Sequence, residues 1–283
     1  MYINGEWLSD GPTFPVFNPA TGEEIGQAPN GTEHDATRAI EAAEAALSGW
    51  MAETAYARSG LLYRAHQLML SQQHELAELM TREQGKPLKA SMNEVKYAAD
   101  FLLWFAEEAK RVYGETIPSA RSDQRFLVQK QPIGVVAAVT PWNYPISMLT
   151  RKLGPALAAG CTVVLKPAES TPLCAIAVFK ILEEAGFPAG VANLVTASDP
   201  KPIGVVFCTH PVVRKLTFTG STTVGKHLAQ ASAPQLKRVS MELGGHAPFI
   251  VYDDADPVHA AKGVSLVKFL NTGQACISPN RIF

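Results

Sequence analysis

The chain has 283 residues, of which 47% are hydrophobic, and its formal net charge is −1, from 25 Lys and Arg against 26 Asp and Glu. This much apolar side-chain surface excludes a wholly disordered chain, and the length predicts one to three domains, with two as the main expectation. The balanced charge, without a basic block, removes the main electrostatic support for binding nucleic acid or an anionic membrane, so we expect a small-molecule partner.

Cysteine usage and the first residues predict a cytoplasmic location. The cysteines are Cys161, Cys174, Cys208 and Cys276, and no two of them form a C-x-x-C pair. Three lie in apolar stretches, which predicts buried, reduced thiols rather than a disulfide framework. The opening MYINGEWLSDG has neither the basic nor the apolar region of a signal peptide, and no run of about 18 apolar residues is present to span a membrane.

The first part of the chain predicts short extended pieces and then helices. Residues 1–32 are rich in turn residues, and Thr32 and Asp35 can cap a helix that runs to residue 47. Further helices are expected over residues 54–70 and 88–112. Residues 113–132 interrupt this order with an extended segment, which predicts a projecting arm or a linker.

From residue 133 the pattern changes to β-branched runs separated by helical stretches. Strands are expected at 133–139, 162–165, 191–196, 215–219, 238–241 and 248–251, and helices at 145–159, 172–185 and 221–231. This alternation predicts βαβ units and a mostly parallel sheet with flanking helices, whose ligand sites lie at the carboxyl ends of the strands.

The end of the chain predicts a last helix and a new strand. Asp254–Pro257 opens a helix to about residue 270, because Asp is a good N-cap and Pro fits the first helical position. A metal-binding loop is the weaker alternative for these aspartates. Residues 281–283 resemble the start of another strand, so we expect the sequence to be truncated at its C-terminus.

A small-residue segment, Gly220–Lys226, follows a predicted strand and opens a helix. A helix N-terminus in this place favours a phosphate, although the alternative is a plain strand–helix turn. The segment nearly matches a P-loop, but His227 stands where Ser or Thr would hold Mg²⁺, which disfavours a nucleotide hydrolase.

Other polar residues also follow predicted strands. Lys166 and Glu169 can bind ribose hydroxyls, or they can be solvated surface groups. No G-x-G-x-x-G fingerprint accompanies them. Asn143, which lies between aromatic residues and prolines, can donate to an oxyanion or cap the following helix.

Two further residues are candidates for catalysis, one as a base and one as a nucleophile. Glu242, which precedes Leu243-Gly244-Gly245, can act as a general base or form a salt bridge. Cys276 lies in a polar, glycine-containing loop, where backbone amides can favour the nucleophilic thiolate. The metal-protease, Cys/His metal and serine-hydrolase spacings are absent, which argues against those classes.

Together these segments resemble the aldehyde dehydrogenase superfamily. The matching stretches are TPWNYP, LKPAESTP, FTGSTTVGK, MELGGHAPFIV and KFLNTGQAC, in the family's order. The resemblance implies an α/β fold with a Rossmann-type parallel sheet, in which residues 1–112 and 133–242 form an NAD(P)-binding domain. It also implies that residues 113–132 form a projecting oligomerisation arm of a dimer or tetramer, and that residues 243–283 begin a second α/β catalytic domain.

The resemblance implies a role for each candidate in aldehyde oxidation to a carboxylic acid. Cys276 would form a thiohemiacetal and then a thioester, Asn143 and the Cys276 N–H would form the oxyanion hole, and Glu242 would activate water. The implied cofactor contacts are Lys166 and Glu169 at the adenosine ribose, Gly220 and Ser221 at the pyrophosphate, and Trp142 along the cofactor. Because a carboxylate repels a 2′-phosphate, Glu169 favours NAD, with NADP as the alternative.

Residues 146–166 and 244–256 look most like succinate-semialdehyde dehydrogenases. Arg151 matches an arginine that binds the distal carboxylate of the substrate there, since a guanidinium grips a carboxylate bidentately. The alternative is a solvated helix arginine. Leu270 departs from that subfamily, which usually has a second arginine at this position. Succinate semialdehyde is the expected substrate; the competing hypothesis is a non-catalytic remnant that at most binds the dinucleotide.

Overall fold

The computed structural model describes all 283 residues, and a seven-stranded sheet forms its centre. The strand order is β11-β10-β7-β8-β9-β1-β2. The bounds are β1 Tyr2–Ile3, β2 Glu6–Trp7, β7 Val135–Val139, β8 Thr162–Lys166, β9 Ala192–Leu194, β10 Val213–Thr219 and β11 Arg238–Glu242. The strands from β7 to β11 pair in parallel, whereas β1 is antiparallel to both of its neighbours. The mostly parallel α/β sheet predicted from the sequence is therefore confirmed.

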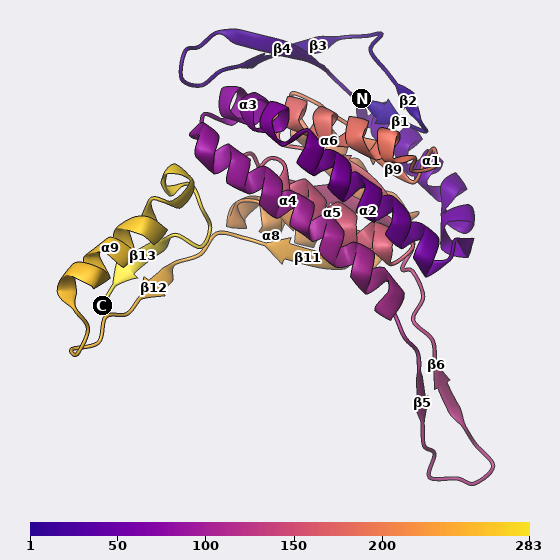
Figure 1. Ribbon diagram of the computed structural model, residues 1–283. Coiled ribbons are helices and arrows are strands. Elements are labelled where there is room, and N and C mark those ends of the chain that lie inside the picture. The colour runs from indigo at the N-terminus through magenta and orange to yellow at the C-terminus, as the bar shows by residue number, and fades with distance from the viewer.

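Helices cover both faces of the sheet (Figure 1). On one face lie α2 (Ala55–Ser71), α4 (Leu88–Glu108), α5 (Ser147–Ala158) and α6 (Pro172–Ala185). The other face is covered by α1 (Glu33–Ala52), α7 (Pro200–Thr209) and α8 (Thr222–Ser232). Successive residues of β7 enter the two cores in turn, because side chains alternate along a strand: Val136 packs with the first group of helices and Val135 with the second.

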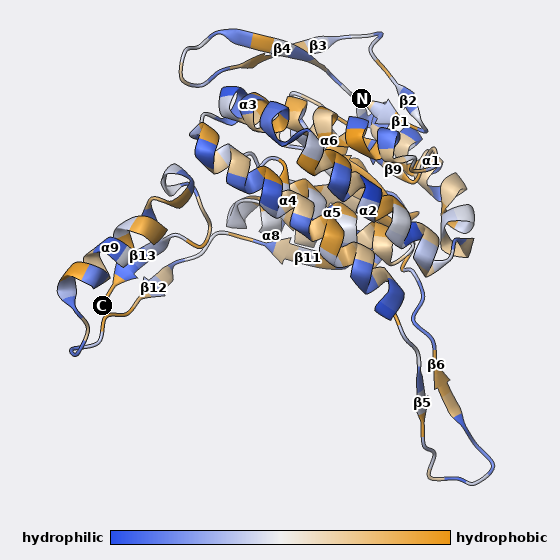
Figure 2. Ribbon diagram, viewed as in Figure 1, coloured by the Kyte–Doolittle hydropathy of each residue, from blue (hydrophilic) through white to orange (hydrophobic).

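Two hairpins stand outside the sheet. In the first, β3 (Thr13–Phe17) pairs with β4 (Glu24–Pro29). In the second, β5 (Glu115–Ile117) pairs with β6 (Phe126–Val128), and Figure 1 shows this hairpin projecting far from the helices. Figure 2 shows that β6 is apolar although its three residues are exposed. The oligomerisation role expected for this arm stays a prediction.

Residues 243–283, which we call the terminal lobe, follow β11. Here β12 (Ala247–Phe249) pairs in parallel with β13 (Pro279–Ile282), and α9 (Pro257–Lys268) lies beside them (Figure 1). Asp256 caps α9 and Pro257 occupies its first turn, as the sequence predicts. The domain boundary expected at residue 243 stays a prediction.

Several helices differ from those expected. The structure contains α3 (Gln73–Gln84) and α7, which the sequence pattern did not predict, and the helix expected to reach residue 112 ends at Glu108 before a short 3-10 turn. The segment of α3 is largely polar, although Leu76, Ala77 and Met80 stand at helical spacing and are buried. In α7 the apolar run Val205-Val206-Phe207 is as typical of a strand as of a helix. Capping by Asp199 and Pro200 nevertheless starts α7. No helix has the length and apolar content needed to cross a bilayer.

Candidate active site

The pairing register brings several predicted site residues to one edge of the sheet. Thr219 pairs with Glu242, and Val139 lies between Phe218 of β10 and Lys166 of β8. Because these strands are parallel, their carboxyl ends form one row. Glu242, Gly220 and Lys166 therefore occupy neighbouring strand ends, with the 140–146 loop between them.

At the end of β10, Gly220 and Ser221 lead directly into α8. A Cβ at Gly220 would collide with the ring of Phe218, so a larger residue here would force that ring to shift. The Ser221 hydroxyl accepts a hydrogen bond from Val224 N at 3.3 Å and caps the helix. Because the first residues of α8 are exposed, the helix offers its N-terminal amides and positive dipole end to an anion.

At the end of β8, the Lys166 ammonium is buried and lies 3.0 Å from a carboxylate oxygen of Glu169, which is half exposed. Burial lowers the pKa of Lys166, and the Glu169 charge opposes this shift. The buried hydroxyls of Thr140 and Thr219 have no hydrogen-bond partner at the same edge, and Trp142 is 44% exposed. Spare hydroxyls, an ammonium–carboxylate pair, a helix N-terminus and an open aromatic face fit a dinucleotide.

The loop after β7 contacts the loop that carries Cys276. Asn143 Nδ2 donates to the carbonyl oxygen of Gln274 at 2.7 Å, two residues before the cysteine. Cys276 is exposed, whereas the other three cysteines are buried, as the sequence predicts. Gly245 also passes close by, because a Cβ there would lie 3.6 Å from the Cys276 carbonyl oxygen. The structure thus brings together Asn143, Cys276 and the segment that follows Glu242.

A buried ion pair that sequence analysis missed supports the Asn143 loop. The Lys86 ammonium pairs with Glu94 and donates to the Asn143 carbonyl oxygen at 2.8 Å, and it lies 4.5 Å from the centroid of the Tyr144 ring. Glu94 also accepts from the main-chain N–H groups of Ile146 and Ser147 at 3.0 and 3.1 Å. Burial lowers the pKa of Lys86, and the Glu94 charge opposes this. The available signal was a carboxylate on the apolar stripe of the helix over 88–112.

Lys152 is a second buried ammonium that sequence analysis missed. It lies on α5 and donates to the Thr217 hydroxyl at 3.1 Å. Burial lowers its pKa to about 8, and the charge of Glu242 opposes the shift. Lys152 therefore lies within electrostatic reach of the carboxylate at the end of β11.

One cavity, of about 340 Å³, contains both Cys276 and Arg151. The guanidinium of Arg151 donates to the Tyr97 hydroxyl at 3.0 Å and lies 5.0 Å from the centroid of the Phe101 ring. Tyr144 also lines this cavity, and burial, with smaller contributions from the Glu94 and Cys276 charges, raises its pKa to about 12. Glu242 does not line the cavity and is exposed.

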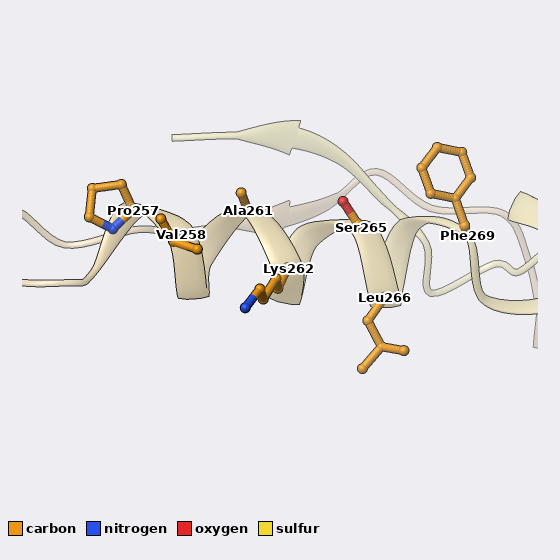
Figure 3. A pocket seen from close by; sticks show the side chains of 7 residues that line it. All are labelled: Pro257, Val258, Ala261, Lys262, Ser265, Leu266 and Phe269. Atoms are coloured by element: carbon orange, nitrogen blue, oxygen red, sulfur yellow. The ribbon is translucent and has the colours of Figure 1, made fainter.

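A second, shallower hollow runs along α9 in the terminal lobe and holds none of the candidate residues. Figure 3 shows the side chains that line it, which are mostly apolar apart from Lys262 and Ser265. No group of three or more His, Cys, Asp or Glu side chains that could hold a metal ion occurs in the structure. The chemistry-bearing side chains therefore gather at the sheet edge and in the 340 Å³ cavity.

Comparison with known proteins agrees with this geometry. Residues 7–283 match the model of the aldehyde dehydrogenase family, and the chain belongs to that family. It is 54% identical to the glutarate-semialdehyde dehydrogenase of Pseudomonas putida, covering 100% of this chain and 59% of that protein. It is 51% identical to the NADP(+) succinate-semialdehyde dehydrogenase of Escherichia coli K12, with coverages of 99% and 58%.

A solved structure shows the same fold. The crystal structure of succinate-semialdehyde dehydrogenase from Burkholderia pseudomallei superposes with a TM-score of 0.97 at 51% identity, and the match covers 100% of this chain and 59% of that chain. The aldehyde dehydrogenase-like fold predicted from the sequence motifs is thus confirmed. The chain spans somewhat less than three-fifths of the length of the relatives it matches.

Proposed function

We propose that this chain carries the nucleophile and the cofactor-binding edge of an NAD(P)-dependent aldehyde dehydrogenase. The observation that carries the proposal is the single cavity that contains an exposed cysteine, Cys276, and a guanidinium, Arg151. A nucleophile and an anion-binding group in one cavity suit an aldehyde that has an acidic group at its far end.

The residues divide the reaction between them. The Cys276 sulfur attacks the aldehyde carbon, and the electron pair of the C=O bond moves to the oxygen. Asn143 donates one of its side-chain N–H bonds to Gln274, which leaves its second N–H, with the Cys276 N–H, for the developing oxyanion. When bound, NAD(P) would accept the hydride that leaves the former aldehyde carbon, and loss of this hydride converts the adduct into a thioester. Glu242 then takes a proton from the water that attacks the thioester, and the acid is released.

Arg151 supplies the proposed substrate preference. Two similar proteins are named for semialdehydes of dicarboxylic acids, succinate and glutarate. A terminal carboxylate on such a substrate would replace the Tyr97 hydroxyl as a partner of the guanidinium, or share the guanidinium with it. Succinate semialdehyde is the first candidate, and its oxidation product is succinate.

The cofactor edge is proposed to hold the dinucleotide through Lys166 and Glu169 at a ribose and through Gly220 and Ser221 at the pyrophosphate. Trp142 would lie along the cofactor. Glu169 supports a preference for NAD, whereas the similar Escherichia coli protein is named for NADP(+). A homo-oligomer joined through the β5–β6 arm is the proposed assembly, and the apolar exposed residues of β6 support it.

Reduction of NAD(P) by aldehydes tests the proposal. Succinate semialdehyde and the uncharged butanal are compared in wild type, Cys276→Ala and Arg151→Leu. Cys208→Ala and Arg111→Leu, in the buried core and in the exposed turn after α4, are the matched controls. We expect Cys276→Ala to abolish turnover of both aldehydes, and Arg151→Leu to reduce turnover of succinate semialdehyde alone. Retained turnover in Cys276→Ala refutes the nucleophile, and an unchanged substrate ratio in Arg151→Leu refutes the carboxylate role. If the chain binds the dinucleotide but no aldehyde leads to its reduction, the competing hypothesis of a non-catalytic remnant is favoured.

A further inference from the structure

The terminal lobe is joined to the rest of the molecule by very few polar contacts. Three hydrogen bonds cross between residues 243–283 and the rest of the chain: Gln84 to the Gln274 side chain at 3.0 Å, Asn143 to the Gln274 carbonyl at 2.7 Å, and the Asn271 side chain to the Asn143 carbonyl at 2.8 Å. Two of these three pass through Asn143. The position of Cys276 relative to Asn143 therefore depends on a small bridge.

Asn271 forms the buried end of this bridge. It is 6% exposed, and in the terminal lobe only Ser278 and Pro279 are also buried. Its Nδ2 donates to the Asn143 carbonyl and also reaches the Gln274 carbonyl at 3.4 Å. Asn143 returns a bond to the same Gln274 carbonyl, so residues 143, 271 and 274 form a closed ring of hydrogen bonds.

The backbone at Asn271 is specialised for this contact. Asn271 and Thr272 have φ angles of 51° and 57°, in the left-handed backbone region that residues other than Gly, Asn and Asp seldom adopt. Two consecutive residues of this kind, five and four positions before Cys276, form a sharp bend that turns the Asn271 amide toward the Asn143 loop. Strained conformations of this type persist where surrounding contacts hold them.

The Asn143 carbonyl receives two donors at equal distance. Lys86 Nζ and Asn271 Nδ2 each lie 2.8 Å from it, which uses both lone pairs of the oxygen. We infer that Asn271 is a positioning residue that sets the oxyanion donor Asn143 against Cys276, while Lys86 holds the same carbonyl from the helix-covered core. This inference rests on the proposed function, because it assigns a purpose to the orientation of Asn143.

Two reactions of the same thiol separate positioning from general loosening. Alkylation by iodoacetamide displaces iodide from carbon and forms no oxyanion. Addition to an aldehyde forms an S–C bond, moves the C=O electron pair to oxygen, and leaves the thiol proton on that oxygen, so it depends on the oxyanion donors. The protection that succinate semialdehyde gives Cys276 against iodoacetamide, followed by mass spectrometry, reports the addition without requiring turnover.

The variants are Asn271→Gly and Asn271→Asp. Glycine accepts the left-handed backbone and removes the donor, and aspartate keeps the size but presents an acceptor to the Asn143 carbonyl. Asn4→Gly is the matched control, because Asn4 has a φ of 53°, is exposed, and lies in the turn between β1 and β2, at the sheet edge opposite β11.

We expect both Asn271 variants to weaken aldehyde protection by about tenfold or more, since small misplacements of a catalytic group are costly. Their alkylation rate without aldehyde should stay within about twofold of wild type, and Asn4→Gly should change neither quantity. Unchanged protection in both Asn271 variants, or a parallel change in protection and alkylation, overturns the inference alone. Failure of the aldehyde to protect wild-type Cys276 overturns the proposed function and this inference with it.

Discussion

Replacing Glu94 by Gln leaves the Lys86 ammonium buried without a counter-charge, and we expect it to destabilise the fold by about 3–5 kcal/mol. The Lys86 and Glu94 side chains are 1% and 2% exposed, so water does not replace the lost partner. A glutamine oxygen can still accept from Ile146 N or Ser147 N, but its NH₂ group would face the ammonium. The charge term, not the loss of the amide contacts, dominates the expected cost.

The assay is the free energy of unfolding from urea titrations of wild type, Glu94→Gln, Glu94→Leu, Lys86→Met and the double variant Lys86→Met/Glu94→Leu. Apolar replacement of both members removes the buried charges, but it leaves the N–H groups of Ile146 and Ser147 unpaired, which costs about 1–3 kcal/mol each. The double variant should therefore be far more stable than the sum of the Lys86→Met and Glu94→Leu losses predicts.

The exposed pair Arg111–Glu108, at 2.8 Å, is the matched control. Glu108→Gln should change stability by less than about 1 kcal/mol, because solvent screens an exposed pair. If Glu94→Gln also stays within about 1 kcal/mol of wild type, or if the Lys86→Met and Glu94→Leu losses add, the buried pair does not stabilise the fold through its charges.

Three further predictions follow from charges at the site and in the core. Burial raises the pKa of Glu83 from 4.5 to about 7, although Leu173 N and Cys174 N donate hydrogen bonds to its carboxylate at 2.6 and 2.9 Å. The folded state therefore binds the Glu83 proton more tightly than the unfolded state. The free energy of unfolding should fall by about 2–3 kcal/mol as the pH rises from 5 to 8. Urea titrations at both pH values should show this loss in wild type and not in Glu83→Gln; equal pH dependence contradicts it. For Lys152, burial lowers the pKa from 10.5 to about 8, so the unfolded state binds more protons than the folded state between these pH values. The free energy of unfolding should therefore rise by about 2–3 kcal/mol between pH 7 and 10. The variant Lys152→Met should lack this rise in stability. If the rise persists in the variant, other titrating groups cause it. Finally, Glu169→Gln should raise the kcat/KM for NADP relative to NAD, because it removes the carboxylate that repels a 2′-phosphate; a ratio equal to that of wild type is evidence against this role.

The sequence predicts the central sheet well, because its signal is local. The strands β7, β8 and β10 contain β-branched residues, and turn residues and a helix follow each of them. The antiparallel pairing of β1 with β9 has no such signal, since it joins Tyr2 to Leu194. The helix α7 was missed because its short apolar run is ambiguous, and in the fold it packs against α1. The helix α3 was missed although Leu76, Ala77 and Met80 stand at helical spacing in its largely polar segment.

The candidate site divides in the same way. Gly220, Lys166 and Glu242 were recognisable because each stands at the end of a predicted strand, although their chemical roles stay predictions. Glu94 and Asn271 were not recognisable from the sequence, because their hydrogen-bond partners are far away along the chain. Glu94 accepts from the N–H of Ile146, 52 residues away, and Asn271 donates to the carbonyl of Asn143, 128 residues away. A local pattern shows that a polar residue lies on an apolar stripe, but only the fold shows which backbone group it satisfies.

These long-range contacts explain how the candidate site combines a well-packed sheet edge with a terminal lobe that buries few side chains. The sheet edge is held by fully buried side chains such as Val164, Leu165 and Leu216, whereas the terminal lobe buries little beyond Asn271, Ser278 and Pro279. Precise geometry requires that the reactive groups be fixed by neighbours whose own positions are fixed. Asn143 meets this condition because Lys86 and Glu94, from the helical layer, hold its loop. Asn143 in turn contacts the cysteine loop through Asn271 and Gln274. Substitutions in the sheet core should therefore act mainly on stability, and substitutions in the bridge mainly on the reactivity of Cys276, because the bridge contributes few of the buried contacts that hold the fold.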